Sequence, residues 1–344
     1  INYVLPPGIE QNIDNTTTIL RRDNEQSLVL KVCNLLDGDA RAAYKTSDLD
    51  VRSYKRLKMF VHAEGIEEQL LDGELSCFIR LGTDFTSNYY EYEIPLKVTQ
   101  HGENGRLEVW PIENNIDIEF DQFQQAKQQR NFNNEDMTSP YISYLENGKK
   151  ITVIGNPNLS RVKTIMIGVR NPKKTSIDSD DDGMPKCGEI WVNELRLTDF
   201  DEYGGWAANA RITTRLADFG TVTLSGNMST IGFGSIEKKV NERQKSNDYQ
   251  YDISSNFELG KFLPEKYGAK IPMYLGLSEQ ISNPQYNPLD PDILFKNTLE
   301  TMGSKSEKDS LKHIAQDYIT RKSVNFTNVR KIPKQQKGEK TKIP

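Results

Sequence analysis

The stretch GGWAANARITTRLADFGTVTLSGNMS, residues 204–229, alternates apolar and polar side chains with the two-residue period of a β-strand. Every second residue from Trp206 is apolar or uncharged: Trp206, Ala208, Ala210, Ile212, Thr214 and Leu216. After the turn-like Asp218–Gly220 the alternation resumes with Val222, Leu224 and Met228. The stretch therefore predicts a hairpin with one apolar and one polar face. Its apolar face suits either a protein core or a lipid bilayer.

Composition limits the other possibilities. A chain of 344 residues with 36% hydrophobic residues and a mean hydropathy of −0.67 is expected to divide into two or more domains. The net charge of −5 gives no general attraction to nucleic acid, so we expect no nucleic-acid partner. The basic tail, residues 330–344, is interpreted as a solvated end. The chain starts at Ile1 without a methionine or a signal peptide, so we expect a fragment or a processed product.

Cysteine, histidine and hydropathy patterns contain no enzyme signature. Cys33, Cys77 and Cys187 are too few and too scattered for a disulfide scaffold or a zinc site, and Cys33 and Cys77 lie in apolar runs that predict small core residues. No HExxH, GxSxG or Walker motif occurs in a suitable context, and no apolar run reaches the length of a membrane helix. We therefore expect a protein that is not an enzyme and that needs no cofactor.

The first 200 residues read as short strands between turns, which predicts a jelly-roll-like β-sandwich over 1–200. The expected strands are 26–32, 56–64, 75–82, 89–96, 150–155, 162–170 and 189–197. One helix is expected over Ile116–Arg130, because Phe120 and Phe123 lie three residues apart among good helix formers.

Residues 204–344 change to longer alternating segments, which predict antiparallel strands of a large transmembrane β-barrel. Short and long connections alternate, and aromatic residues stand at the strand ends, as in such barrels. The predicted lipid-facing residues are Trp206, Ala208, Ala210, Ile212, Leu216, Val222 and Leu224. The predicted lumen-facing residues are Asn209, Arg211, Thr213 and Arg215. An ordinary antiparallel sheet with one solvated face remains the alternative.

Six longer motifs are specific in their wording: NYVLPPGI (2–9), NEQSL (24–28), GNPNLSRVKTIMIGVRNP (155–172), EIWVNELRLTDFDEYGGWAANA (189–210), NPQYNPLDPDI (283–293) and VNFTNVRK (324–331). Together they resemble the SprA/Sov family of Bacteroidetes. The resemblance covers almost the whole chain and implies an internal segment of a much larger protein. It implies an outer-membrane barrel that serves as the translocon of the type IX secretion system, in some members required for gliding motility.

One loop has the spacing of a calcium-binding loop. Asp178, Asp180, Asp182, Gly183 and Glu189 of DSDDDGMPKCGE occupy positions 1, 3, 5, 6 and 12 of an EF-hand. Pro185 and the strand-like flanks depart from that motif, so an acidic, solvent-exposed loop is the competing interpretation. The sequence therefore leaves two interpretations of this loop: a structural calcium held by Asp178, Asp180, Asp182 and Glu189, or an acidic loop in solvent.

Two other function classes stay open from sequence. The strands also resemble jelly-roll carbohydrate-binding modules, for which Tyr89, Tyr90, Tyr92 and Trp191 would be the available platform, although alternation favours core positions for Tyr90 and Tyr92. A β-sandwich glycosidase would require two carboxylates converging in a cleft. A carbohydrate-binding surface module followed by a second β domain is therefore the alternative to the export channel.

The combined expectation is a segment of an outer-membrane protein-export channel that conducts folded cargo to the cell surface. Its partners would be secreted cargo proteins, other secretion-system subunits and outer-membrane lipid. Because tight turns of such barrels are periplasmic, the turn at Asp218–Gly220 places residues 1–200 outside the cell as a cap. The connections 237–248 and 282–321 would then also be external.

Overall fold

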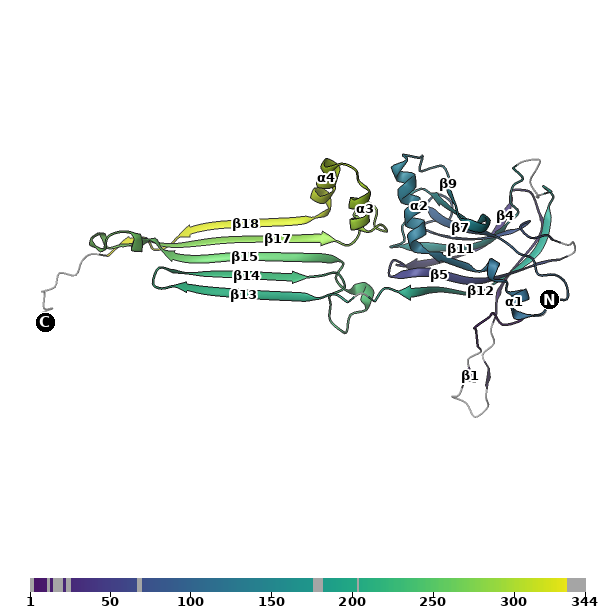
Figure 1. Cartoon of the computed structure of the whole chain (residues 1–344), viewed down its shortest axis with the longest axis horizontal. Coiled ribbons are helices and arrows are strands. Elements are labelled where there is room, and N and C mark those ends of the chain that lie inside the picture. Colours follow the sequence, from purple (N-terminus) through teal and green to yellow (C-terminus); the bar gives the residue numbers. More distant parts are fainter. Residues whose placement is uncertain are drawn as a thin grey trace. The chain divides into compact units, whose positions relative to one another are not determined.

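The computed structural model describes residues 3–10, 13–14, 21–22, 26–66, 70–175, 182–202 and 204–332. The chain divides into two compact units, Ile1–Asp201 and Glu202–Pro344. Both units are built mainly from antiparallel strands, with few helices (Figure 1). The expected all-β fold class is therefore confirmed.

The first unit is a sandwich of two antiparallel sheets. The six-stranded sheet has the order β4-β11-β6-β7-β10-β9, and the four-stranded sheet has the order β3-β12-β5-β8. The strands of the first sheet are β4 (Ala40–Leu49), β6 (Ser76–Gly82), β7 (Tyr89–Pro95), β9 (Tyr141–Tyr144), β10 (Lys150–Ile154) and β11 (Val162–Arg170). The strands of the second are β3 (Leu28–Leu35), β5 (Tyr54–Gly65), β8 (Ile116–Glu119) and β12 (Lys186–Phe200). Strands β1 (Ile13–Asp14) and β2 (Arg21–Arg22) pair separately.

The sandwich is held by side chains that alternate inward from both sheets. Ile79 and Tyr90 of the six-stranded sheet and Val61 and Ile190 of the four-stranded sheet are fully buried in one core cluster. Burial of such side chains contributes about 1.5–3 kcal/mol each. The shared core explains why seven separate strand-like runs of sequence fold into one domain.

The predicted helix over Ile116–Arg130 begins four residues too early. Residues Ile116–Glu119 form β8, which pairs with β5 and buries Ile116 and Ile118, and α2 spans Phe120–Phe132. The alternation of isoleucine with acidic residues suits a strand with one buried face, and this tertiary pairing overrides helix propensity. Phe120 and Phe123 are both buried, as expected for one face of the helix.

An N-terminal segment covers an aromatic cluster on the outer face of the four-stranded sheet. The Tyr3 ring lies 6.2 Å from Trp110 and 6.0 Å from Trp191, measured between ring centroids. The Trp110 Nε1–H donates to the carbonyl of Val4 at 2.7 Å, next to the short helix α1 (Arg106–Val109). Beneath them His62 is fully buried, with its ring 4.3 Å from that of Trp191. The motif at the start of the chain thus seals part of the sandwich surface.

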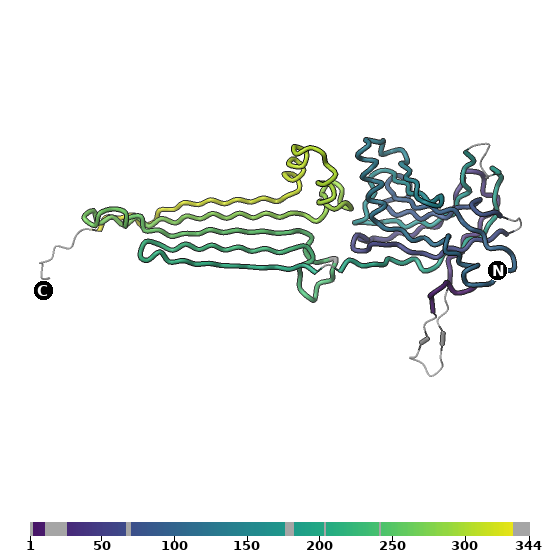
Figure 2. Tube along the Cα trace, in the orientation of Figure 1, coloured from purple at the N-terminus to yellow at the C-terminus, as the bar shows by residue number. Residues whose placement is uncertain are grey.

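The second unit is a single antiparallel meander. Its five-stranded sheet has the order β13-β14-β15-β17-β18, and the strands run side by side along the trace (Figure 2). They are β13 (Ala207–Leu216), β14 (Gly220–Ser229), β15 (Ser246–Glu258), β17 (Pro272–Pro284) and β18 (Asp317–Phe326). A small sheet joins β16 (Ala269–Lys270) to β19 (Arg330–Lys331). The sheet is open over the residues that the structure describes, with β13 and β18 at its edges.

The expected long connection between 282 and 321 contains structure of its own. It includes α3 (Phe295–Thr301) and α4 (Lys305–Ala315), and the Ser304 hydroxyl accepts a hydrogen bond from the Glu307 N–H at the start of α4. Such N-capping stabilises a helix by about 1 kcal/mol. β17 and β18 are also longer than the alternating segments indicated, so the connection itself is shorter than predicted.

Candidate lipid and lumen faces of the C-terminal sheet

The strand register places the two predicted residue sets of the hairpin on opposite faces. Ala208, Ala210, Ile212 and Leu216 share one face of β13, and Val222 and Leu224 lie on the same face of β14 because Ile212 pairs with Leu224 and Thr214 with Val222. Trp206 stands just before β13. The other face of β13 carries Asn209, Arg211, Thr213 and Arg215. The sequence pattern therefore translates directly into two chemically different surfaces.

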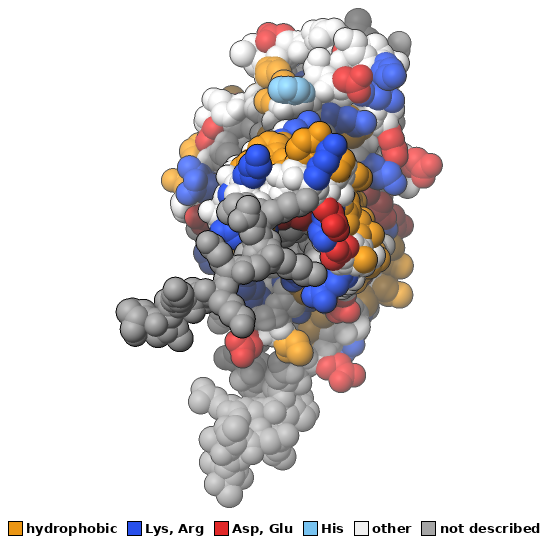
Figure 3. Space-filling model, turned by 90° about the vertical axis from the view of Figure 1, so that its left-hand side faces the viewer, with side chains coloured by type: hydrophobic (Ala, Val, Ile, Leu, Met, Phe, Trp, Pro, Cys, Tyr) orange, Lys and Arg blue, Asp and Glu red, His pale blue; other side chains and the backbone are white. Residues whose placement is uncertain are grey.

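The apolar face continues across the whole sheet. Ile212, Leu224, Ile253 and Leu277 are successive partners on β13, β14, β15 and β17. Exposed fractions are 65% for Ile212 and 48% for Leu224, so this row is open rather than packed under another layer. Other exposed apolar side chains of this face are Leu216, Leu275, Val324 and Phe326. Hydrophobic side chains of the molecule are visible at the surface in Figure 3.

Apolar patches that cross five strands are uncommon on soluble monomers, where they mark contact with another protein or with a membrane. Two charged residues interrupt this face near β18. Lys322 ends the row that begins at Ile212, and Glu279 accepts a hydrogen bond from the Tyr318 hydroxyl at 3.1 Å. A lysine can extend its amine along an apolar surface toward water, so one such residue is compatible with a largely apolar band.

The opposite face is mostly polar, although β18 also presents the exposed Ile319 there. The row through Arg211 continues with Ser225, Asp252, Ser278 and Arg321. The row through Thr213 contains Thr223, Ser254, Gly276 and Ser323, and the Thr213 and Thr223 hydroxyl oxygens lie 3.3 Å apart. Hydroxyl, amide and charged groups of both signs produce a hydrated surface without a large single-sign field.

A pocket at the end of this face, lined by both polar and apolar residues, was missed by the sequence reasoning. It has a volume of about 810 Å³ and is lined by Lys312 and His313 of α4 together with Gln280 of β17 and Asp317 of β18. Gln316, which links α4 to β18, donates from Nε2 to the Asn283 Oδ1 at 2.6 Å. The amphipathic spacing within 305–315 was the available signal, but it lay inside a segment interpreted as a loop.

The calcium prediction falls partly outside the described residues, because Asp178 and Asp180 belong to 176–181. The Asp182 carboxylate accepts hydrogen bonds from Lys186 Nζ and the Met184 N–H, both at 2.8 Å, and these bonds, chiefly that of Lys186, lower the pKa of Asp182. Glu189 lies within β12, where its Oε1 accepts from Trp191 Nε1 at 2.8 Å. Among residues with described positions, no group of three acidic, histidine or cysteine side chains is placed to hold a metal.

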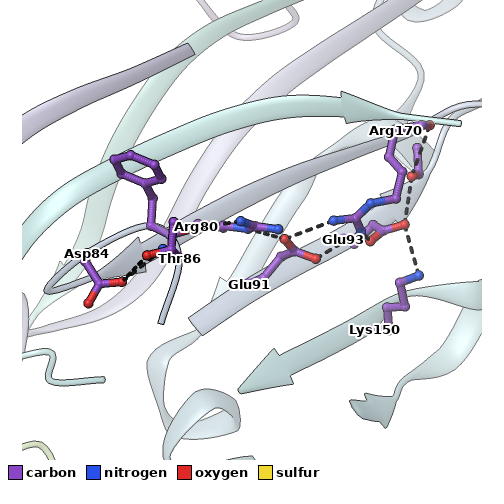
Figure 4. A network of polar contacts seen from close by, with 9 residues as sticks. Arg80, Asp84, Thr86, Glu91, Glu93, Lys150 and Arg170 are labelled. Atoms are coloured by element: carbon purple, nitrogen blue, oxygen red, sulfur yellow. Dashed lines mark hydrogen bonds and ion pairs between the residues drawn. The ribbon is translucent and has the colours of Figure 1, made fainter. Parts of the chain in front are cut away.

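Two buried carboxylates on the outer face of the six-stranded sheet are the next candidate for chemistry (Figure 4). Glu91 accepts from Arg80 Nε at 2.5 Å and from Arg170 Nη1 at 3.0 Å. Glu93 accepts from the Ser76 hydroxyl at 2.7 Å, forms an ion pair with Lys150 at 3.0 Å and also binds Arg170. Three cations thus enclose two carboxylates, which suits a structural network better than a general acid and its partner base.

The proposed sugar-binding aromatic residues are not available as a surface. Tyr89, Tyr90, Tyr92 and Trp191 each expose 6% or less. Tyr90 and Tyr92 lie in the core, whereas Trp191 lies on the outer face and is covered by Tyr3. Alternation indicated which residues share a face, but it could not indicate that the N-terminal segment covers Trp191.

Cys33 also differs from expectation, because it is exposed, while Cys77 is buried in the core as expected.

Within the described part of the chain, no helix combines the length and apolarity needed to cross a membrane.

Comparison with known families and proteins gives two results. The sequence model of the family SprA_N, described as motility related/secretion protein, matches residues 1–299. No curated protein matches the chain at a significant level.

Proposed function

The chain belongs to the motility-related and secretion protein family SprA_N, and on that premise we propose that it is a segment of an outer-membrane protein-export channel. This family is a secretion and motility family rather than an enzyme family, which is consistent with a location in the cell envelope. In the proposal, the second unit supplies consecutive strands of a large transmembrane barrel. The channel would act as a type IX secretion translocon and would conduct folded cargo proteins to the cell surface.

The observation that carries the proposal is the open apolar row Ile212–Leu224–Ile253 on one face of a sheet whose other face is polar. β13, β14 and β18 have 10 residues each, and β15 and β17 have 13, so each is long enough to cross a bilayer at the usual tilt. In a barrel, the apolar face would contact lipid and the polar face would line the conduit. A hydrated wall of mixed charge would let cargo pass without adhering.

The edge strands support the same proposal. β13 and β18 each have a strand neighbour on one side in the described residues, which leaves backbone N–H and C=O groups along the other side. Unpaired edges cannot lie in hydrocarbon, so a membrane-embedded sheet has to continue into further strands until it closes. The proposal therefore requires strands beyond this sheet and, as partners, outer-membrane lipid, cargo and other secretion subunits.

The proposal can be tested with spin labels, by measuring how often each label collides with apolar oxygen and with a water-soluble nickel complex. Labels at Ile212 and Val222 are the lipid-face probes, and labels at Thr213 and Thr221 are matched controls on the polar face of the same strands. In the intact protein within its native membrane, we expect collisions with oxygen to dominate at the first pair and collisions with nickel to dominate at the second. Equal accessibility of both pairs to nickel would exclude the barrel assignment.

A further inference from the structure

Two of the three cysteines, 154 positions apart in sequence, are brought together where β3 pairs with β12. Val32 pairs with Gly188 and Leu35 pairs with Lys186, with a bulge between these pairs. Cys33 and Asn34 on β3 therefore face the single residue Cys187 on β12. Asn34 has the positive φ of 53° that such an irregularity favours.

The sulfur of Cys187 is directed toward this bulge. The Asn34 N–H donates a hydrogen bond to Cys187 Sγ at 3.3 Å, so this sulfur lies beside the residue that follows Cys33. Opposed residues in antiparallel strands have Cα atoms about 4.5–5.5 Å apart, and disulfides span Cα separations of about 4.4–6.8 Å. The backbone spacing of the pair is therefore suitable for a disulfide.

Both cysteines lie on the same side of the sheet. Val32 and Leu35 are buried in the core, and a Cβ on Gly188 would meet the Leu75 side chain at 2.7 Å, so Gly188 also faces the core. Alternation then puts Cys33 and Cys187 on the outer face. Cys33 is exposed and Cys187 is partly exposed, so an oxidant in solution can reach the pair.

We propose that Cys33 and Cys187 form a disulfide that fastens the edge strand β3 to β12 in an oxidising compartment. Both are thiols in this structure. The exposed Cys33, as thiolate, attacks a small-molecule or protein disulfide, forms a mixed disulfide and releases one thiol. The Cys187 thiolate then attacks the Cys33 sulfur and displaces the second thiol. Two cysteine thiols are oxidised, and one external disulfide is reduced to two thiols.

The third cysteine provides an internal control. Cys77 is fully buried in the core, and burial raises its pKa to about 12, so its thiol stays protonated and unreactive. The Cys33–Cys187 bond would close a loop that contains most of the sandwich, which restricts the unfolded chain and stabilises the fold. The inference concerns the sandwich alone and does not depend on the channel proposal.

The test is thiol mapping of the whole chain after incubation with oxidised glutathione. We expect two of the three thiols to disappear, the mass to fall by two hydrogen atoms, and a non-reducing digest to contain the Cys33 peptide joined to the Cys187 peptide. The melting temperature should rise by about 5–15 °C over the reduced chain.

Three cysteine variants test whether the linked peptide and the rise in melting temperature come from the Cys33–Cys187 bond. Cys77→Ala should keep the linked peptide and the temperature shift. Each of the single variants Cys33→Ser and Cys187→Ser should abolish the linked peptide and the temperature shift. The remaining cysteine of the pair should then form a mixed disulfide with glutathione. Separate glutathione adducts on both cysteines of the unaltered chain, or a link between two copies, would overturn the proposal.

Discussion

Replacing Ile212 by arginine tests whether the apolar face meets lipid. Ile212 is the sixth of ten residues of β13. At about 3.3 Å per residue and a tilt of about 45°, it lies roughly 12 Å and 9 Å in depth from the two strand ends. That depth is close to the midplane of a bilayer, where an arginine on the lipid face costs about 2–4 kcal/mol.

The matched control is Thr213→Arg, one residue further on the polar face. This change loses the contact between the Thr213 and Thr223 hydroxyls, which contributes about 0.5–1.5 kcal/mol. The free energy of unfolding should therefore fall by about 1–3 kcal/mol more for Ile212→Arg than for Thr213→Arg. Reversible denaturant unfolding of the protein in lipid vesicles would measure both changes.

A sheet in water gives the opposite expectation. The Ile212 side chain is already 65% exposed, and a surface substitution of this kind changes stability by about 0.5 kcal/mol or less. If Ile212→Arg is no more destabilising in vesicles than Thr213→Arg, the assignment of this face to lipid is wrong.

Three further predictions concern other parts of the chain. If the acidic loop binds calcium, calcium should raise the melting temperature and Asp182→Asn should weaken that rise, whereas a chain indifferent to calcium and to EDTA would leave only a solvated loop. Protease added to intact cells should cut within 282–321 if this connection is external, and protection until the membrane is permeabilised would reverse the orientation. Burial lowers the pKa of His62, so the stability that depends on its neutral form is complete above the unfolded pKa of about 6.5 and is lost as pH falls toward the folded pKa. Melting temperatures from pH 7.5 to 5 should therefore fall more steeply for the unaltered chain than for His62→Gln, and parallel profiles would contradict this assignment.

Local alternation was sufficient to predict the two faces of the hairpin and most of the strands, but it missed β4, β8 and β9. A two-residue period shows directly which residues share a face, so Ile212 and Leu224 could be assigned together before their pairing was known. The same reasoning misplaced the start of α2, because Ile116 and Ile118 are drawn into a strand by pairing with β5, a contact between distant parts of the chain.

Periodicity did not reveal what covers a face or which strands are neighbours. Trp191 is buried because Tyr3, far away in sequence, packs against it. Cys33 was expected in the core because it lies in an apolar run, but Val32 faces the core, so alternation puts the next residue, Cys33, on the outer face. Register and bulges arise from pairing across the sheet, so the proximity of Cys33 and Cys187 could not be inferred from their spacing.

The distribution of the three tryptophans gives each unit a separate optical signal. Trp110 and Trp191 are shielded within the sandwich, with exposed fractions of 0% and 6%, while Trp206 at the start of the meander exposes 55%. An indole shielded from water emits at shorter wavelength than one in water, and Trp206 alone would be open to quenching by iodide or by brominated lipid. Fluorescence from an otherwise unaltered chain can therefore follow the sandwich and the start of the meander independently, without an introduced label.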